Sequence, residues 1–137
     1  MSPVLNASVF IAAISPTERH HHQARRLFDS HPDTEQFLVP ELFRVEVIAG
    51  LSRRGEPADF LDTVDAVIRG PRFHARPLDG ELLERAVHVA RVARLRAYDA
   101  VYVALALMWN EPILTLDGEV VERTGASFGD LRVFGST

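Results

Sequence analysis

Residues 3–14, PVLNASVFIAAI, place a short apolar strand directly before an apolar helix, and this unit sets the pattern of the chain. The apolar run Pro3 to Leu5 predicts a buried strand. Ala7 to Ile14 suits a short helix, and Asn6 between them is a residue type that caps helix N-termini. We therefore expect the chain to turn from a strand into a helix at Asn6.

The same alternation of short apolar strands and helices continues to the end of the chain. Further strands are predicted at about 37–39, 73–77, 112–116 and 131–134, and helices at about 17–28, 40–54, 58–69, 79–90, 97–109 and just after 117. This order favours an α/β fold with a central parallel sheet. Ligands of such sheets collect at the carboxyl ends of the strands, near the point where the strand order reverses.

The composition of the 137 residues fits a single domain over 1–137 and excludes several chemistries. The chain has no cysteine, which excludes disulfides, thiolate zinc sites and cysteine nucleophiles and fits a cytoplasmic location. It has no lysine, which excludes a Walker A lysine and a Schiff-base lysine. The net charge of -4 argues against a general nucleic-acid coat, so a polyanion needs local arginines or metal ions. No apolar run reaches the ~18 residues of a membrane span, and we expect no membrane association.

Two acids stand in apolar helices, where an ionised carboxylate is costly unless a positive group meets it. Glu46 lies between Val45 and Val47, and a buried pair with Arg53 is an alternative explanation. Asp99 is the only charged residue of 97–110, and a first-turn acid or N-cap facing the helix dipole is the alternative there.

Two further polar residues, Asn6 and Asp117, each follow a predicted strand. Helix capping or a turn explains each of them singly. A parallel sheet, however, can bring both to one edge, together with the acids of the two apolar helices. Clustered carboxylates repel one another, and a hard divalent cation, Mg²⁺ or Mn²⁺, is the usual remedy. The set therefore predicts metal-assisted hydrolysis of a phosphodiester.

Four runs in this order and spacing resemble PIN-domain ribonucleases, with VapC-type toxins of bacterial toxin–antitoxin pairs the nearest likeness. They are VLNASV at 4–9, PELFRVEV at 40–47, AYDAVYVALA at 97–106 and LTLD at 114–117. The resemblance spans essentially the whole chain. It implies a three-layer α/β/α sandwich, a Mg²⁺- or Mn²⁺-dependent endoribonuclease, a cognate antitoxin that inhibits it, and a homodimer.

The resemblance also assigns site residues. Glu46, Asp99 and Asp117 match the acidic metal ligands, Ser8 matches a supporting hydroxyl, and Thr115 lies in the strand end before the last acid.

Asn6 departs from the pattern, because the family has an aspartate at this catalytic and metal-binding position. Asn6 keeps one carbonyl oxygen but loses the charge, so three carboxylates carry -3 instead of -4. We expect a weakened or inactive metal site. Asn6 is either an engineered or a natural change, and the intact neighbouring motifs favour the former.

Arginines near these acids are candidates for RNA phosphates, which guanidinium groups bind bidentately. They are Arg44, Arg94 and Arg96, with Arg53 and Arg54 as further candidates, and pairing with surface acids is the alternative for each. The run His20–His22 predicts a solvated helix face, because adjacent helical residues point about 100° apart. Tyr98, Tyr102 and Trp109 are expected in the core or an interface.

Two other functions remain open at this point. One is a non-catalytic PIN-like module that binds RNA or an antitoxin without cutting. The other is a flavodoxin-like receiver domain, against which the missing lysine argues.

Overall fold

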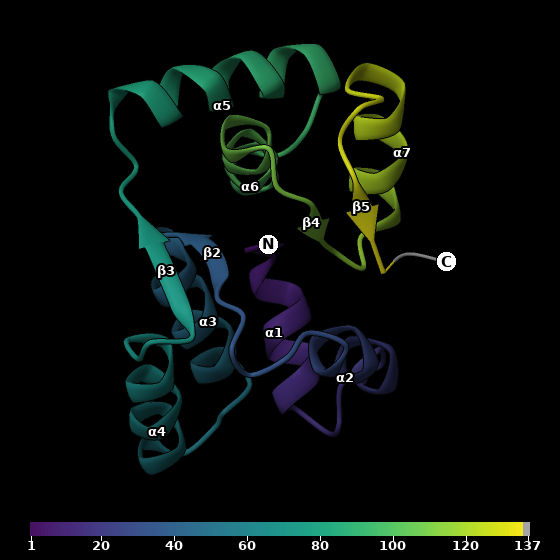
Figure 1. Ribbon diagram of the computed structural model, residues 1–137. Coiled ribbons are helices and arrows are strands. Elements are labelled where there is room, and N and C mark those ends of the chain that lie inside the picture. Colours follow the sequence, from purple (N-terminus) through teal and green to yellow (C-terminus); the bar gives the residue numbers. More distant parts are fainter. Residues whose placement is uncertain (136–137) are drawn as a thin grey trace.

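The computed structural model describes residues 1–135 and contains a five-stranded parallel sheet (Figure 1). The strands are β1 (Val4–Leu5), β2 (Phe37–Pro40), β3 (Phe73–Arg76), β4 (Ile113–Leu114) and β5 (Val133–Phe134). They lie in the order β3-β2-β1-β4-β5 and every neighbouring pair is parallel. The predicted parallel sheet is confirmed.

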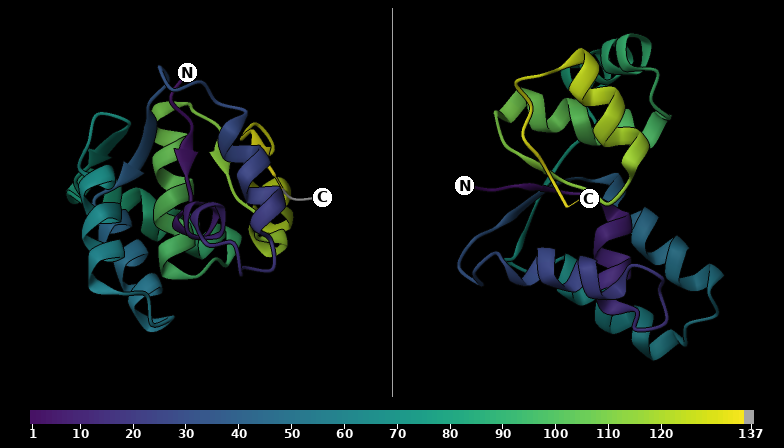
Figure 2. Two further views of the ribbon diagram at one scale, coloured as in Figure 1. Left: turned by 90° about the horizontal axis from the view of Figure 1, so that it is seen from below. Right: turned by 90° about the vertical axis from the view of Figure 1, so that its right-hand side faces the viewer.

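Helices cover both faces of this sheet. They are α1 (Ala7–Ile14), α2 (His21–Asp29), α3 (Leu42–Arg53), α4 (Ala58–Ile68), α5 (Gly80–Ala93), α6 (Ala97–Trp109) and α7 (Gly118–Ser127). Figures 1 and 2 show α1 to α4 on one face and α5 to α7 on the other. The predicted α/β/α sandwich is therefore confirmed. Within residues 1–135, no helix is both long and apolar enough to cross a membrane.

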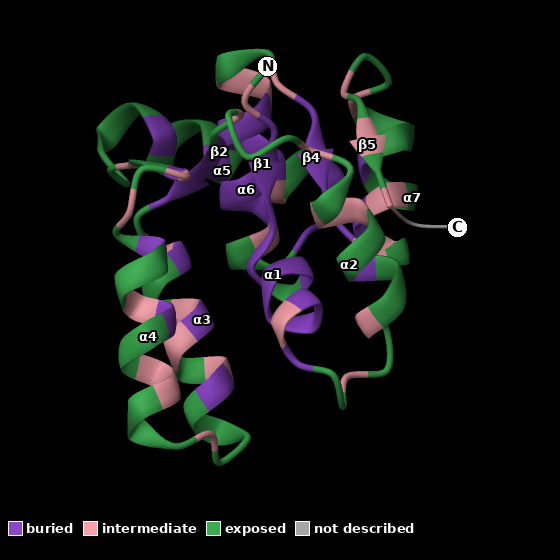
Figure 3. Cartoon of the chain, turned by 60° about the horizontal axis from the view of Figure 1, so that its bottom comes forward, coloured by how far each residue is buried: buried purple, intermediate pink, exposed green. Residues whose placement is uncertain are grey.

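The central strands and α6 are buried because helices pack on both sides of a parallel sheet. The residues of β1 and β4 are fully inaccessible to solvent, and those of α6 from Ala100 to Ala106 are all buried (Figure 3). An apolar surface all round α6 was the pattern that predicted this position.

Aromatic packing joins α1 to the β3 side of the sheet. The Phe10 ring lies 5.9 Å from that of Phe28, 5.7 Å from that of Phe43 and 5.3 Å from that of Phe73, measured between centroids. Phe10 is 3% exposed. This cluster fixes α1, and hence the residue that precedes it, against the sheet.

Two predicted element boundaries were wrong. Pro40 was expected to start a helix, but it ends β2 and pairs with Arg76 of β3, while α3 begins two residues later. The helix expected from about 17 begins at His21, because the backbone N–H groups of Glu18 and His21 each close a turn, onto Ser15 and Glu18. Long-range strand pairing and loop turns of this kind leave no periodic signal in the sequence.

We expect Phe10→Ala to lower the free energy of unfolding by about 3–5 kcal/mol, the usual cost of removing a buried Phe side chain. Urea denaturation followed by circular dichroism measures it. Val45→Ala is the control, because Val45 is 69% exposed. Equal losses for the two variants would contradict the packing described.

Candidate active site

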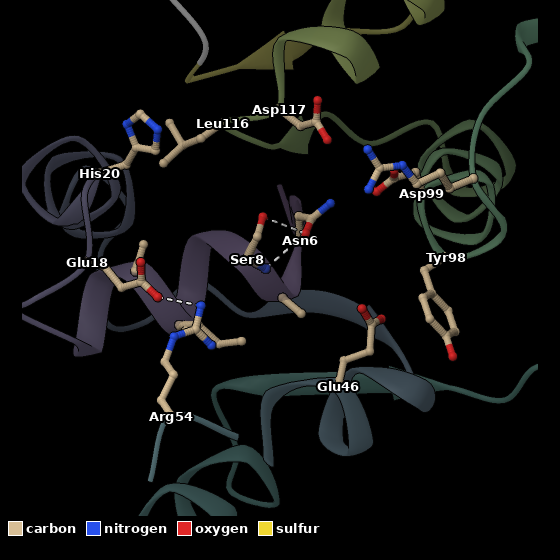
Figure 4. A pocket seen from close by; sticks show the side chains of 14 residues that line it. Asn6, Ser8, Glu18, His20, Glu46, Arg54, Tyr98, Asp99, Leu116 and Asp117 are labelled. Atoms are coloured by element: carbon tan, nitrogen blue, oxygen red, sulfur yellow. Dashed lines mark hydrogen bonds and ion pairs between the residues drawn. The ribbon is translucent and has the colours of Figure 1, made fainter. Parts of the chain in front are cut away.

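A cavity of about 480 Å³ lies where the strand order reverses. β1 pairs with β2 on one side and with β4 on the other, so the chain leaving β1 and the chain leaving β4 are neighbours at the same sheet edge. Asn6, Glu46, Asp99 and Asp117 all line this cavity (Figure 4). The expected convergence of these four residues, which come from four segments of the sequence, is what the structure shows.

Asn6 caps α1, as its position after a strand predicts. Its side-chain oxygen Oδ1 accepts from the Ser8 backbone N–H at 3.0 Å and from Ser8 Oγ at 2.9 Å. Because a backbone N–H can only donate, Oδ1 must stay on Ser8 and the amide nitrogen Nδ2 must point elsewhere. Figure 4 shows that nitrogen on the side facing Asp99. The side-chain oxygen of Asn6 is therefore engaged at the helix cap, and its expected part in a metal site stays a prediction.

Asp117 makes the same cap at the start of α7 and has an oxygen to spare. Oδ1 accepts from the backbone N–H groups of Glu119 at 2.9 Å and Val120 at 3.4 Å. Buried Thr115 accepts the Asp117 backbone N–H at 3.1 Å through Oγ1. These bonds fix the carboxylate and leave Oδ2 for the cavity.

Glu46 is held by a tyrosine and not by the arginine considered as an alternative. Its Oε1 accepts from the Tyr102 hydroxyl at 2.9 Å, and Tyr102 is 1% exposed. Burial raises the pKa of the Glu46 carboxyl, the Tyr102 hydrogen bond opposes this shift, and the Asp99 charge adds to it. Tyr102 was expected in the core. Its function as a donor could have been anticipated, since a buried tyrosine hydroxyl usually finds a partner.

Asp99 lies in the first turn of α6, whose N-cap is Arg96. Burial raises the pKa of the Asp99 carboxyl and the nearby Asp117 charge raises it further, while Arg96 and the Asn6 amide oppose the shift. Because Arg96 is the N-cap, the alternative that Asp99 caps the helix is wrong. The alternative that Asp99 is a first-turn acid near the helix dipole is confirmed.

Three helices begin at this cavity, which explains how the fold tolerates the acids. Asn6 and Asp117 cap α1 and α7, and Asp99 lies in the first turn of α6. Helix N-termini carry partial positive charge and favour anions within the first turn. The local backbone thus offsets part of the carboxylate repulsion.

The arginine candidates separate clearly in the structure. Arg96 lines the cavity, and so does Arg54. Arg44 lies outside the cavity lining and forms a bidentate pair with Asp65 of α4 at 2.7 and 3.0 Å. Arg94 ends α5 with a φ of 55°, and its carbonyl accepts from Arg123. Neither of the last two lines this cavity, so their expected contact with RNA phosphates stays a prediction.

Several further residues line the cavity without having been predicted as site residues, and the polar ones among them are Glu18, His20 and Tyr98. Tyr98 is 61% exposed, so it lies outside the core of the chain, and the expected place in an interface stays a prediction. The histidine run is not a uniformly solvated face either, because His21 Nδ1 lies 2.7 Å from the Ala12 carbonyl oxygen.

The donor set suits a hard cation, but the side chains do not form a closed cage. Within residues 1–135, no group of three or more His, Asp or Glu side chains is gathered closely enough to hold a metal ion. Mg²⁺ is commonly held by one or two carboxylates and keeps several waters, so an open set of carboxylate oxygens fits it. Asp117 and Asp99, whose carboxyl pKa is raised by burial and by the Asp117 charge, are the closest match to this need.

Fold and cavity together define an α/β protein with an acidic pocket at the switch point of a parallel sheet. The family model of the PIN domain matches residues 4–126, and the chain belongs to this family. A search of curated proteins finds no match to the sequence.

Several solved structures share this fold. The VapC20 toxin of Mycobacterium tuberculosis, described as cleaving the sarcin-ricin loop, is 20% identical with a TM-score of 0.74, over 96% of this chain and 99% of that one. A toxin–antitoxin complex from Klebsiella pneumoniae is 15% identical with a TM-score of 0.71, over 97% and 96%. FitAcB from Neisseria gonorrhoeae is 15% identical with a TM-score of 0.71, over 96% and 95%. At these identities the likeness establishes the fold.

We expect Asp99→Asn to raise the free energy of unfolding at pH 7 in EDTA. A raised carboxyl pKa means that ionisation opposes folding above the ordinary aspartate pKa of about 4, and asparagine removes that cost. The gain should shrink as pH falls through the raised pKa of the folded state and vanish well below 4, where aspartate is protonated in both states.

Urea titrations at several pH values measure this gain. Asp130→Asn, in an exposed loop, is the control and should show no such dependence. A loss of stability at pH 7 for Asp99→Asn would contradict the electrostatic account.

Proposed function

We propose that this chain is the toxin of a VapBC-type toxin–antitoxin pair and an endoribonuclease that hydrolyses RNA phosphodiesters with Mg²⁺ or Mn²⁺. The observation that carries the proposal is the convergence of Glu46, Asp99 and Asp117 on one cavity at the sheet switch point of a PIN domain. The likeness to VapC20, a toxin that cleaves the sarcin-ricin loop, supports the substrate class.

Asp99 and Asp117 would hold the ion, with Glu46 as a third oxygen donor. When bound, the ion supplies Lewis acidity and a water of lowered pKa. Tyr102 keeps the Glu46 carboxylate in place through its hydroxyl. Thr115 and the α7 backbone keep Asp117 in place. Arg96 at the cavity wall would bind the phosphate, and Ser8 would orient the residue at position 6.

Asn6 weakens this site through its geometry as well as its charge. An aspartate at position 6 would cap α1 with one oxygen and present the other to the cavity, as Asp117 does. Asn6 presents an amide N–H₂, which donates hydrogen bonds and cannot ligate a cation. We therefore propose that the activity of this chain is low or absent.

The partners proposed are an RNA strand, a cognate antitoxin and a second copy of the chain, in the cytoplasm. The likeness to the toxin–antitoxin complex from Klebsiella pneumoniae supports the antitoxin. An antitoxin arginine that enters the cavity would be neutralised by the three carboxylates there, which provides a mode of inhibition.

A second candidate function is a PIN domain that binds RNA or an antitoxin without cutting. The observation that favours it is the Asn6 amide, which donates toward Asp99 where the family pattern has an acid. The two candidates share the cavity and differ in whether restoring an aspartate restores cleavage.

We expect Asn6→Asp to tighten Mn²⁺ binding by about 10–100-fold, the range that loss of a metal-site partner commonly costs. Isothermal titration calorimetry measures the affinity, and a gel assay with Mg²⁺ or Mn²⁺ measures RNA cleavage, which should appear in the variant.

Asn110→Asp is the matched control, because it changes the chain's other asparagine at the far end of α6. If Asn6→Asp folds, binds no Mn²⁺ and leaves RNA intact, the nuclease proposal is wrong and the binding module is the better account.

A further inference from the structure

The cavity extends beyond the carboxylates along α1. Its floor runs from Asn6 and Ser8 to Ile11 and Ala12, a rise of about 9 Å at 1.5 Å per residue. The far end is lined by Glu18, His20 and Arg54 (Figure 4). The space is therefore longer than a single phosphate group, and a cation-bearing end lies one to two helical turns from the acidic centre.

The position of Arg54 at the far end of the cavity depends on Gly50. Its Nη1 donates to the Gly50 carbonyl at 2.9 Å, one turn back on α3. A Cβ on Gly50 would lie 3.2 Å from that Nη1 and 2.8 Å from Ile11 Cδ1. Without a side chain at position 50, α3 packs closely on α1 and the guanidinium folds over the helix end into the cavity.

The partner of Arg54 is Glu18, which comes from the α1–α2 loop. The two side chains form an ion pair and are 45% and 25% exposed. The loop is positioned by the Glu18 backbone bond to Ser15 and by His21 on the Ala12 carbonyl. In the free chain, the Glu18 carboxylate is therefore already paired with Arg54 at this end of the cavity.

We propose that Arg54 binds a backbone phosphate of the RNA strand next to the acidic centre, and that Glu18 takes the place of that phosphate until the strand arrives. The inference rests on the proposed function and adds a second contact to it. Arginine binds carboxylates and phosphates through the same bidentate geometry. Arg54 can therefore exchange the Glu18 carboxylate for a phosphate without losing hydrogen bonds. Exposed ion pairs are weak, so a phosphate can displace the carboxylate. With Arg96 at the other end, the strand is held on both sides of the carboxylates.

The alternative is that Arg54 and Glu18 only clamp α3 to the loop, and two substitutions separate the alternatives. If the pair is a clamp, Arg54→Gln and Glu18→Gln break the same contact and, relative to variants that remove the same charge elsewhere, change RNA binding in the same direction. If Arg54 is a phosphate site, Arg54→Gln weakens binding, whereas Glu18→Gln frees the arginine, removes a negative charge and strengthens it.

The experiment is fluorescence anisotropy with a labelled single-stranded RNA of mixed sequence, in EDTA, over a series of salt concentrations. Arg53→Gln is the control for Arg54→Gln, because it removes the same charge from the adjacent residue outside the cavity. Glu122→Gln on α7 is the control for Glu18→Gln.

We expect Arg54→Gln to weaken binding several-fold more than Arg53→Gln and to reduce the slope of log K against log salt by about one. We expect Glu18→Gln to tighten binding relative to Glu122→Gln. Equal effects of the two arginine variants, or weaker binding by Glu18→Gln, would overturn the inference. If Arg54→Gln does not fold in thermal denaturation, the sign of the Glu18→Gln effect decides.

Failure of this inference is distinguishable from failure of the proposed function. If Asn6→Asp cuts RNA while Arg54→Gln binds it like Arg53→Gln, only the phosphate site is wrong. If no form of the chain binds or cuts RNA, both proposals fall.

Discussion

Helix capping is the constraint on which the cavity depends. In Asn6 and in Asp117, one side-chain oxygen accepts a backbone hydrogen bond from the first turn of the helix that follows the strand. Asp117 has a second oxygen left for the cavity, whereas Asn6 has only an amide nitrogen. An asparagine in place of an aspartate at position 6 therefore changes more than the charge of the side chain. It replaces a carboxylate oxygen by a hydrogen-bond donor at a fixed place, because the cap prevents the amide from turning over.

The same geometry explains why acids gather at an edge where they repel. The sheet reverses its strand order between β1 and β4, so the helices that follow these strands start side by side. Their N-terminal dipoles favour negative charge. They do not cancel it, since the pKa values of Glu46 and Asp99 stay raised by burial and by neighbouring acids. The fold thus keeps an unbalanced negative pocket, which is the property a divalent cation or a guanidinium would relieve.

Local sequence patterns predict the residues that meet at the cavity better than they predict where helices and strands begin and end. Short apolar strands, the apolar surface of α6 and the caps at Asn6 and Asp117 are local signals, and the structure confirms them. The acids could be predicted to meet because each stands where an acid is costly or follows a strand. Three things could not be read from local pattern: the pairing of Pro40 with Arg76, the turns before His21, and the Glu18–Arg54 pair. Each joins residues through tertiary contact, and charge alone gave Arg44 and Arg96 equal standing although only Arg96 lines the cavity.

The central claim is that the pocket attracts a divalent ion while the amide of Asn6 stays out of its coordination. Anomalous diffraction from crystals of this chain grown with Mn²⁺ tests it most directly. We expect an anomalous peak for a manganese ion that is bound by oxygens of Asp99 and Asp117, while Asn6 Oδ1 still accepts from the Ser8 N–H. A pocket without manganese at saturating concentration, or a manganese ion coordinated by Asn6 Oδ1, would contradict it.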